Sequence, residues 1–169
     1  SSKKCRRIRR MRAPLSLVVL SSMLLAACGP DVDLTKGLQV ADVATGWHDD
    51  GILPDGNNKI VPAVSFKVKN VSDQTLRALQ VNVIFKRLND EVEWGSGFFV
   101  VLKCGGLAAG AVSDPIAANS QQGYTSIEPR ADMLHHKEFV DARVQLFAKY
   151  GSIQWTKIAE YQIDRRLLN

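Results

Sequence analysis

Cysteine, histidine and long apolar runs are all scarce in this chain. Its 169 residues contain three cysteines and three histidines. Three cysteines are too few for a disulfide framework, so the folded part must be stabilised by packing. The longest apolar candidate, Leu15–Ala27, has thirteen residues, whereas a membrane-spanning helix needs about 20. The composition therefore excludes a disulfide-stapled miniprotein and gives no transmembrane helix.

Motifs for nucleotide binding and covalent catalysis are also missing. The sequence has neither a glycine-rich phosphate loop nor a dinucleotide fingerprint. Trp94-Gly95-Ser96-Gly97 lacks the residue between Ser and Gly that a nucleophile elbow requires, and it precedes an expected strand. We therefore expect a protein that is not an enzyme, with no catalytic residue and no cofactor.

The N-terminal segment has the organisation of an export signal. Residues 1–12 carry seven Lys or Arg and no acid, the uncharged stretch 15–25 follows, and Leu25-Ala26-Ala27-Cys28 ends it. This order is typical of a secretory signal peptide. With cysteine at the cleavage position, it resembles the lipobox of bacterial lipoproteins.

That resemblance implies cleavage between Ala27 and Cys28 and a lipid, such as palmitate, on Cys28. We expect residues 1–27 to be the removed signal peptide, 28–37 a lipidated tether and 38–169 the folded domain. Translation is expected to start at Met11, because a complete short lipoprotein signal begins there. Gly29 is not the aspartate associated with inner-membrane retention, so we expect an outer-membrane lipoprotein facing the periplasm.

The net charge changes sign once the signal peptide is removed. The whole chain has 22 Lys and Arg against 17 Asp and Glu, a formal charge of +5. Seven of the bases lie in residues 1–12, which leaves 22 − 7 = 15 bases against 17 acids, or −2. Bases and acids are interleaved along the remainder. This pattern excludes a nucleic-acid partner and leaves the membrane, through Cys28, and an envelope protein as expected partners.

Apolar residues alternate with polar ones in most of the chain after residue 37. Such two-residue periodicity with β-branched and aromatic side chains on one face is typical of half-buried antiparallel strands. One of Trp47, Trp94 and Trp155 is expected to fill the core. We predict an all-β fold, a sandwich of two antiparallel sheets, with about seven strands near 38–46, 61–70, 76–87, 93–103, 122–128, 141–150 and 152–163.

Turn residues separate the predicted strands. Exposed loops are expected at 49–51 and 54–58, turns at 70–73 and 89–90, and a tight hairpin at 150–152. Residues 105–111, rich in Gly and Ala, are expected to cross from one sheet to the other. Gly95 and Gly97 are expected to mark a β-bulge.

Two of these strands carry a family resemblance. The stretch 62–72 ends in Lys69-Asn70-Val71-Ser72, and 79–85 then alternates up to Phe85. Together they are similar to the FxLYD-type and related immunoglobulin-like domains of bacterial lipoproteins, with Ile116–Ser120 as a later turn. The resemblance implies an immunoglobulin-like sandwich in the cell envelope; it carries no specific function.

Met133-Leu134-His135-His136 is the strongest candidate for a metal site. Methionine and histidine are ligands that copper accepts. A third ligand would have to come from elsewhere, such as Asp132, Glu138 or Cys104, and a solvated loop explains the motif more simply. Cys104 itself fits a buried strand end, an intermolecular disulfide or a reactive thiol.

These observations favour a membrane-anchored envelope lipoprotein whose single domain is a non-enzymatic binding or assembly module. The alternative is a periplasmic lipoprotein that binds a metal or small ligand through Met133, His135 and His136, with Cys104 as a further candidate ligand. The two differ in whether added metal stabilises the domain.

Overall fold

The structure is a computed structural model that describes residues 32–101, 105–151 and 154–168. The lipobox, including Ala27 and Cys28, lies outside the described residues, as does Cys104. Val32–Asn169 forms one compact unit. Its elements in chain order are α1 Leu34–Gly37, β1 Leu38–Ile52, β2 Asn58–Asn70, β3 Leu79–Arg87, β4 Glu93–Val101, β5 Ile116–Asn119, β6 Tyr124–Ser126, α2 Arg130–Met133, β7 Ala142–Tyr150, β8 Thr156–Gln162 and β9 Leu167–Leu168.

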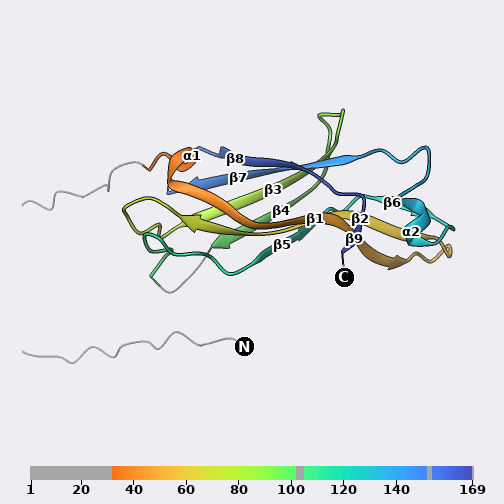
Figure 1. Ribbon diagram of the computed structural model, residues 1–169, viewed down its shortest axis with the longest axis horizontal. Helices are drawn as coiled ribbons and strands as arrows, with labels where there is room; N and C mark the ends of the chain where they lie inside the picture. Colours follow the sequence, from red (N-terminus) through yellow and green to blue (C-terminus); the bar gives the residue numbers. More distant parts are fainter. Residues whose placement is uncertain (1–31, 102–104, 152–153, 169) are drawn as a thin grey trace, which may run out of the picture. The chain divides into compact units, whose positions relative to one another are not determined.

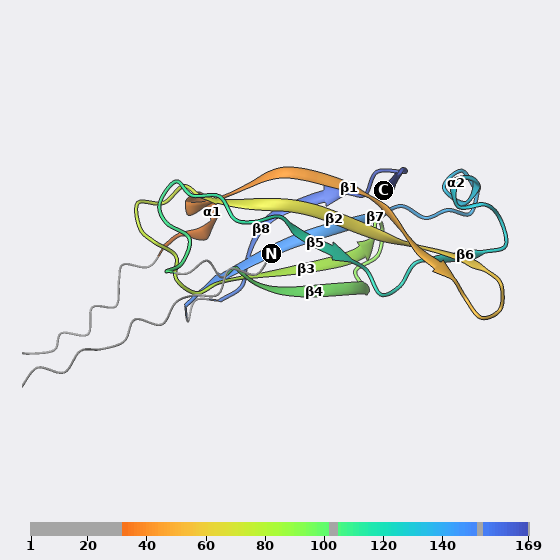
Figure 2. The same cartoon turned by 90° about the horizontal axis from the view of Figure 1, so that it is seen from below.

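The strands form two sheets that face each other, as Figure 2 shows. The first has the order β5-β2-β1-β9, and β6 pairs with the first three residues of β2, Asn58–Ile60. The second has the order β4-β3-β7-β8. All pairs are antiparallel except β1–β9, which is parallel. The predicted all-β sandwich of two sheets is therefore confirmed.

The core lies between the sheets and is built by the alternating residues identified above. Val64, Phe66 and Val68 on β2 are buried, as are Val81 and the other inward residues of β3. Trp47 on β1 is fully buried and is the tryptophan that fills the core. Removing such side chains from water is the main stabilising contribution to a fold of this kind.

The first strand is longer than the sequence indicated, and the loop expected at 49–51 is wrong. Asp49 pairs with Ile60 and Gly51 with Lys59, so this stretch continues β1 into a long hairpin with β2. A β-bulge lies between these two pairs, and Gly51 adopts a positive φ of 92° there, which glycine tolerates. The polar side chains are tolerated because this end of the hairpin is exposed. The turn itself lies at Leu53–Asn57, where Asn57 donates to Asp55.

Other strand boundaries also differ from the prediction. Residues 116–119, expected as a turn, form β5 against β2, and β9 has no counterpart in the prediction. The strand expected at 122–128 is limited to β6, and the one expected at 76–87 begins at Leu79. The loop after β4 crosses from the second sheet to the first, as expected for 105–111.

The N-terminal boundary of the folded unit also differs from the expected tether. Val32 and Leu34 are buried in the core, and Asp33 caps α1 by accepting from the N–H of Thr35 at 3.0 Å. The unit thus begins at Val32 and not at residue 38. Within it, α1 lies at one end of the sandwich, and β6 and α2 lie at the other (Figure 1).

Candidate functional site

Four aromatic side chains from distant parts of the sequence meet near the α2 end of the sandwich. Trp47 packs edge-on against Phe139, with ring centroids 4.7 Å apart, and against Trp94 at 6.2 Å. Tyr124 stacks on Phe139 at 4.5 Å and meets Trp94 at 5.7 Å. Edge-to-face and offset-stacked pairs of this kind stabilise beyond their buried area. These four residues, here called the aromatic cluster, join both sheets to the loop after α2.

Tyr124 links the aromatic cluster to that loop by hydrogen bonds. Its hydroxyl accepts a hydrogen bond from the N–H of Val140 and lies 3.3 Å from the Val140 carbonyl oxygen, to which it donates. Tyr124 belongs to β6, which is held by its pairing with β2. The loop between α2 and β7 is thereby fixed over the rim of the core, and its Phe139 is buried.

Two hollows open beside the aromatic cluster. The smaller, of about 180 Å³, is lined by side chains of β6, α2 and the loop after it, among them Tyr124, Met133, His136 and Phe139. The larger, of about 590 Å³, is a shallow surface depression lined by Arg87, Trp94, Gln122, Tyr124, Glu138 and Val140, with Lys59. Concave sites with aromatic walls and a few polar groups are the usual form of a binding site. We call the larger one the Arg87–Trp94 hollow.

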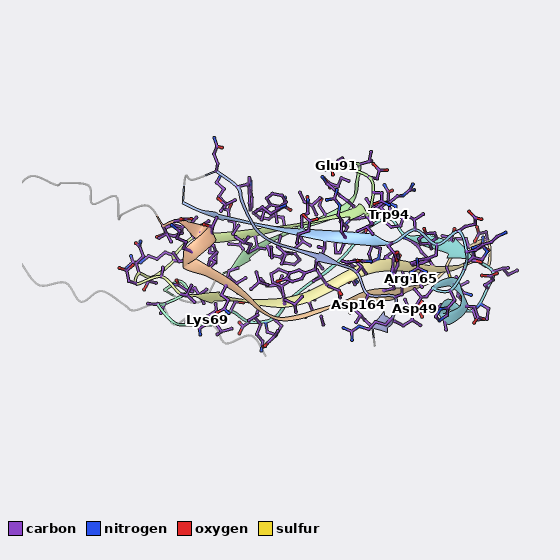
Figure 3. The ribbon with its side chains drawn as sticks, turned by 45° about the horizontal axis from the view of Figure 1, so that its top comes forward. Asp49, Lys69, Glu91, Trp94, Asp164 and Arg165 are labelled. Carbon is purple, nitrogen blue, oxygen red and sulfur yellow. The ribbon has the colours of Figure 1, made fainter. Side chains whose placement is uncertain are left out.

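Charge in this hollow centres on Arg87. Its guanidinium lies 5.4 Å from the ring centroid of Trp94, a cation–π distance. The Arg87 carbonyl accepts a hydrogen bond from the Asp90 N–H, but among the described residues its guanidinium makes no hydrogen bond or ion pair. Lys59, by contrast, pairs with Asp50 at 2.7 Å. Arg87 is therefore the cation of this hollow that has charge available for an incoming group. Figure 3 shows Trp94 near the β3–β4 hairpin that bears Glu91.

A second arginine at this end of the sandwich, Arg165, makes contacts that stabilise the fold. Arg165 lies 5.0 Å from the ring centroid of Phe139, and its guanidinium donates to both oxygens of Asp141 at 2.7 and 3.0 Å. The hydrogen bond to Asp141 raises the pKa of Arg165. Such a bidentate pair fixes the geometry of both partners. We therefore treat Arg165 as structural and Arg87 as the candidate binding residue.

The predicted metal candidates do not converge on one point. Met133 is buried, whereas His135 and His136 are exposed. The Nδ1 atom of His136 accepts a hydrogen bond from the N–H of Glu138 at 3.2 Å. Within the described ranges, no group of three or more His, Cys, Asp or Glu side chains is placed to hold a metal ion. Met133 and His136 do share the smaller hollow.

The remaining sequence features have clear positions where the structure describes them. Ser96 lies in an extended edge strand and not in a strand-to-helix elbow. Trp94 is the bulged residue between the pairs Phe85–Gly95 and Lys86–Glu93, so the bulge lies one residue before the expected stretch 95–97, in which Gly95 and Gly97 are regularly paired. In the part of the chain that is described, no helix is both long and apolar enough to cross a membrane.

Sequence reasoning did not single out Arg87, Tyr124 or Phe139. Arg87 ends the alternating run of β3, and nothing local relates it to Tyr124 in the next sheet. The one available signal in the sequence was Trp94, a large aromatic residue next to the glycines that predicted a bulge. Bulges are often found next to functional sites.

Comparisons with known proteins add little to this description. No protein-family model matches the chain, and a comparison with curated proteins finds no match. One similar solved structure is the structural genomics target SoR45, with a TM-score of 0.44, 14% identity, and coverage of 77% of this chain and 88% of that one. Another is a Bordetella pertussis protein provisionally designated ApaA, with a TM-score of 0.40, 16% identity, and coverage of 75% and 91%. Similarity at this level carries no functional argument.

Proposed function

We propose that this chain is a lipid-anchored lipoprotein of the bacterial cell envelope whose β-sandwich is a non-enzymatic binding or assembly module. The observation that carries the proposal is the order of basic head, apolar stretch and Leu25-Ala26-Ala27-Cys28. Cys28 bears the lipid, and by the lipobox resemblance the anchor lies in the outer membrane and faces the periplasm. Several acyl chains on one residue hold a protein firmly, whereas a single chain binds only marginally.

The arrangement of the folded unit supports a role in binding. The polypeptide enters the sandwich at α1, at the end opposite to β6 and α2 (Figures 1 and 2). A module tethered through α1 therefore has its aromatic cluster and the Arg87–Trp94 hollow at the end away from the tether. The hollow combines an indole wall with a guanidinium that makes no ion pair among the described residues, which suits a carboxylate or another anionic group of a partner protein.

The anchoring part of the proposal is tested by Cys28→Ala. This variant should accumulate as an unprocessed precursor, incorporate no radiolabelled palmitate and leave the membrane fraction, while circular dichroism shows an intact sandwich. Cys104→Ala is the matched control and should be acylated normally. Acylation of the Cys28→Ala variant, or a mature protein that begins at another residue, would contradict the proposal.

The binding part is tested separately with Arg87→Glu in the lipidated protein. In-cell crosslinking followed by mass spectrometry should recover an envelope partner with the wild type and lose it with Arg87→Glu. Lys36→Glu, a charge reversal on α1 at the other end, should leave recovery unchanged. Equal recovery with Arg87→Glu would exclude the hollow as the contact.

A second candidate function is supported by the smaller hollow, where Met133 and His136 lie together with Tyr124 and Phe139. A soft metal or a small ligand held there would stabilise the folded state by mass action. Addition of Cu or Zn should then raise the melting temperature of the wild type more than that of His136→Ala. Equal melting shifts in the two proteins would remove this candidate.

A further inference from the structure

The second sheet ends in two edge strands of unequal length. In the second sheet, β4 and β8 are the edge strands. The helix α1 and strand β1 approach β8, and β5 of the first sheet approaches β4. β4, with nine residues, is the longer edge of that sheet and begins beside the Arg87–Trp94 hollow. An open strand edge is a template for pairing with another chain, and natural proteins usually cover it.

The first half of the β4 edge is covered by side chains of the segment after β5. The Ser96 N–H donates to Oε1 of Gln121 at 2.9 Å, and Nε2 of Gln121 donates to the Ser96 carbonyl at 2.9 Å. Ser120 adds a hydrogen bond from its hydroxyl to the Trp94 carbonyl at 3.0 Å. Gly95 permits this close approach, because a Cβ there would lie 2.4 Å from the Ser120 hydroxyl.

The second half, Gly97–Val101, has no such cover. The backbone groups of Ser96 point away from β3, and in an antiparallel strand every second residue points the same way. Phe98 and Val100 therefore also direct their N–H and C=O groups outward. For these groups no hydrogen-bond partner occurs in the ranges 32–101, 105–151 and 154–168.

The side chains along this open stretch are apolar. Phe98 and Val100 lie on the outer face and are 57% and 46% exposed. Trp155, which is 39% exposed, packs edge-on against Phe98 at 6.1 Å. No residue from Gly95 to Val101 is ionisable. Lysine, proline or an inward-pointing charge, the usual protection of an edge, is absent from this stretch.

A groove follows the same stretch on the inner side. It has a volume of about 240 Å³ and lies between β4 and the residues leading into β5. Its lining includes Phe99, Val101 and Ile116, and also the polar residues Ser113 and Asp114. A strand added to the β4 edge would direct alternate side chains outward beside Phe98 and inward into this groove.

We propose that β4 pairs antiparallel with β4 of a second copy of this chain, about a two-fold axis at Phe99. Phe99 is the midpoint of the uncovered stretch Gly97–Val101, so this register uses all of it and leaves the Ser96–Gln121 contact intact. Phe98 then exchanges both backbone hydrogen bonds with Val100 of the partner subunit. The two second sheets become one continuous sheet across the dimer.

The chemistry of the stretch favours a second copy as the occupant. A two-fold interface brings each surface patch against itself, so any charge in it would meet a like charge. The absence of ionisable residues from Gly95 to Val101 removes that penalty along the paired strands, although Asp114 lines the adjoining groove. The register places an aromatic residue opposite a β-branched one, a favourable cross-strand pair. It also places Phe99 of the partner subunit beside the groove that contains Phe99 and Ile116.

Sedimentation velocity of the full chain in density-matched detergent tests the proposal. The wild type should sediment as a dimer that dissociates on dilution. Val100→Pro removes an outward N–H without removing a β3–β4 hydrogen bond, so it should be monomeric. Val100→Thr keeps the N–H and should still dimerise. A wild type that is monomeric at every concentration would overturn the proposal.

Phe98→Lys is a second test of the interface, for use if Val100→Pro does not fold. Position 98 is exposed, so it tolerates a polar side chain. This variant should be folded by circular dichroism and monomeric, and dimer formation by it would also reject the proposed interface.

Disulfide trapping then tests the register. In the proposed register, Phe99 lies opposite Phe99 of the partner subunit, and these two residues exchange no hydrogen bonds. The Cα atoms of such an antiparallel pair are about 4.5 Å apart, which is close enough for a disulfide. Phe99→Cys in a Cys104→Ser background should form an intermolecular disulfide. Asn82→Cys, on the neighbouring strand β3, is the control and should not. A dimer that Phe99→Cys fails to trap would mean that another surface forms it.

Discussion

The carboxamide of Asn70 donates a 2.8 Å hydrogen bond to the carbonyl of Leu107, a residue 37 positions later in the chain. Asn70 is fully buried at the end of β2. Its amide nitrogen also donates to Gln74 at 2.8 Å, and its oxygen accepts from the backbone and hydroxyl of Ser72. One side chain therefore holds both the turn after β2 and the crossover loop between the sheets.

Replacing Asn70 by Ala should lower the free energy of unfolding by about 2–3 kcal/mol, because it removes the two hydrogen bonds that its amide nitrogen donates and the two that its oxygen accepts, each worth about 0.5–1.5 kcal/mol. Asn70→Asp should cost at least as much, since a carboxylate cannot donate to either carbonyl and carries a buried charge. Ser72→Ala, which removes only the hydroxyl that donates to the Asn70 oxygen and the Gln74 carbonyl, is the milder control. Urea denaturation measures all three, and an Asn70→Ala loss no larger than that of Ser72→Ala would refute the expectation.

Trp47 should tolerate Phe far better than Ala. Its indole N–H is buried and has no acceptor among the described residues, so Trp47→Phe loses no hydrogen bond. We expect Trp47→Phe to cost about 1–2 kcal/mol and Trp47→Ala about 3–5 kcal/mol, the difference reflecting cavity size. Thermal or chemical unfolding gives both values. Equal losses would mean that the ring does not support the aromatic cluster through its packing.

The stabilising effect of Glu160 should disappear in acid. Hydrogen bonds from Gln145, Lys157 and Arg143 lower its pKa from 4.5 to about 2. Because the folded-state pKa is depressed, the stabilisation is complete above the unfolded value and is lost as the pH falls through the folded one. The carboxylate is partly exposed, so we expect about 1 kcal/mol at neutral pH.

Unfolding free energies of the wild type and Glu160→Gln should therefore differ at neutral pH and converge as the pH approaches about 2. Other carboxylates with depressed pKa values, such as Asp33 and Asp49, are present in both proteins and cancel in the difference. A difference that stays constant over this range would show that the pairing is not electrostatic.

Gln121 should protect one backbone amide selectively. The Ser96 N–H is satisfied by the Gln121 side chain alone, at an exposed position. In Gln121→Ala, hydrogen exchange at Ser96 should accelerate by about tenfold or more, while the inward-facing amide of Gly97 is unchanged. Gln121→Asn, which is one methylene shorter, should resemble Ala. Unaltered exchange at Ser96 would mean that solvent does not reach this edge.

Alternation in the sequence was enough to predict the fold class and the inner face of the central strands. Phe66, Val83 and Leu146 are buried as their period indicated, since register in a half-buried sheet is dictated by which face is apolar. The turn at Asn70 was predicted from its residue types, and its buried hydrogen bonds account for them. These features are local or nearly local.

Long-range contacts explain what the sequence did not reveal. β5 and β9 are short, and each exists because it pairs with a strand distant in the chain, β2 and β1 respectively. The Arg87–Trp94 hollow depends on Tyr124 reaching across from the other sheet. The lipidation prediction at Cys28 concerns residues outside the described structure, so the experiment on Cys28→Ala remains its test.

The pairing of β3 with β7 has a consequence for how the protein reaches its folded state. Leu79 pairs with Tyr150 and Arg87 with Ala142, so the centre of the second sheet joins residues more than fifty positions apart. Such non-local pairings form slowly. The β3–β4 hairpin is local and is expected to form early, and its β3 edge stays open until β7 pairs with it. Before β7 docks, the hairpin therefore exposes the β3 edge as well as the uncharged stretch of β4, so it should be most prone to intermolecular aggregation then, and a low chain concentration should favour refolding.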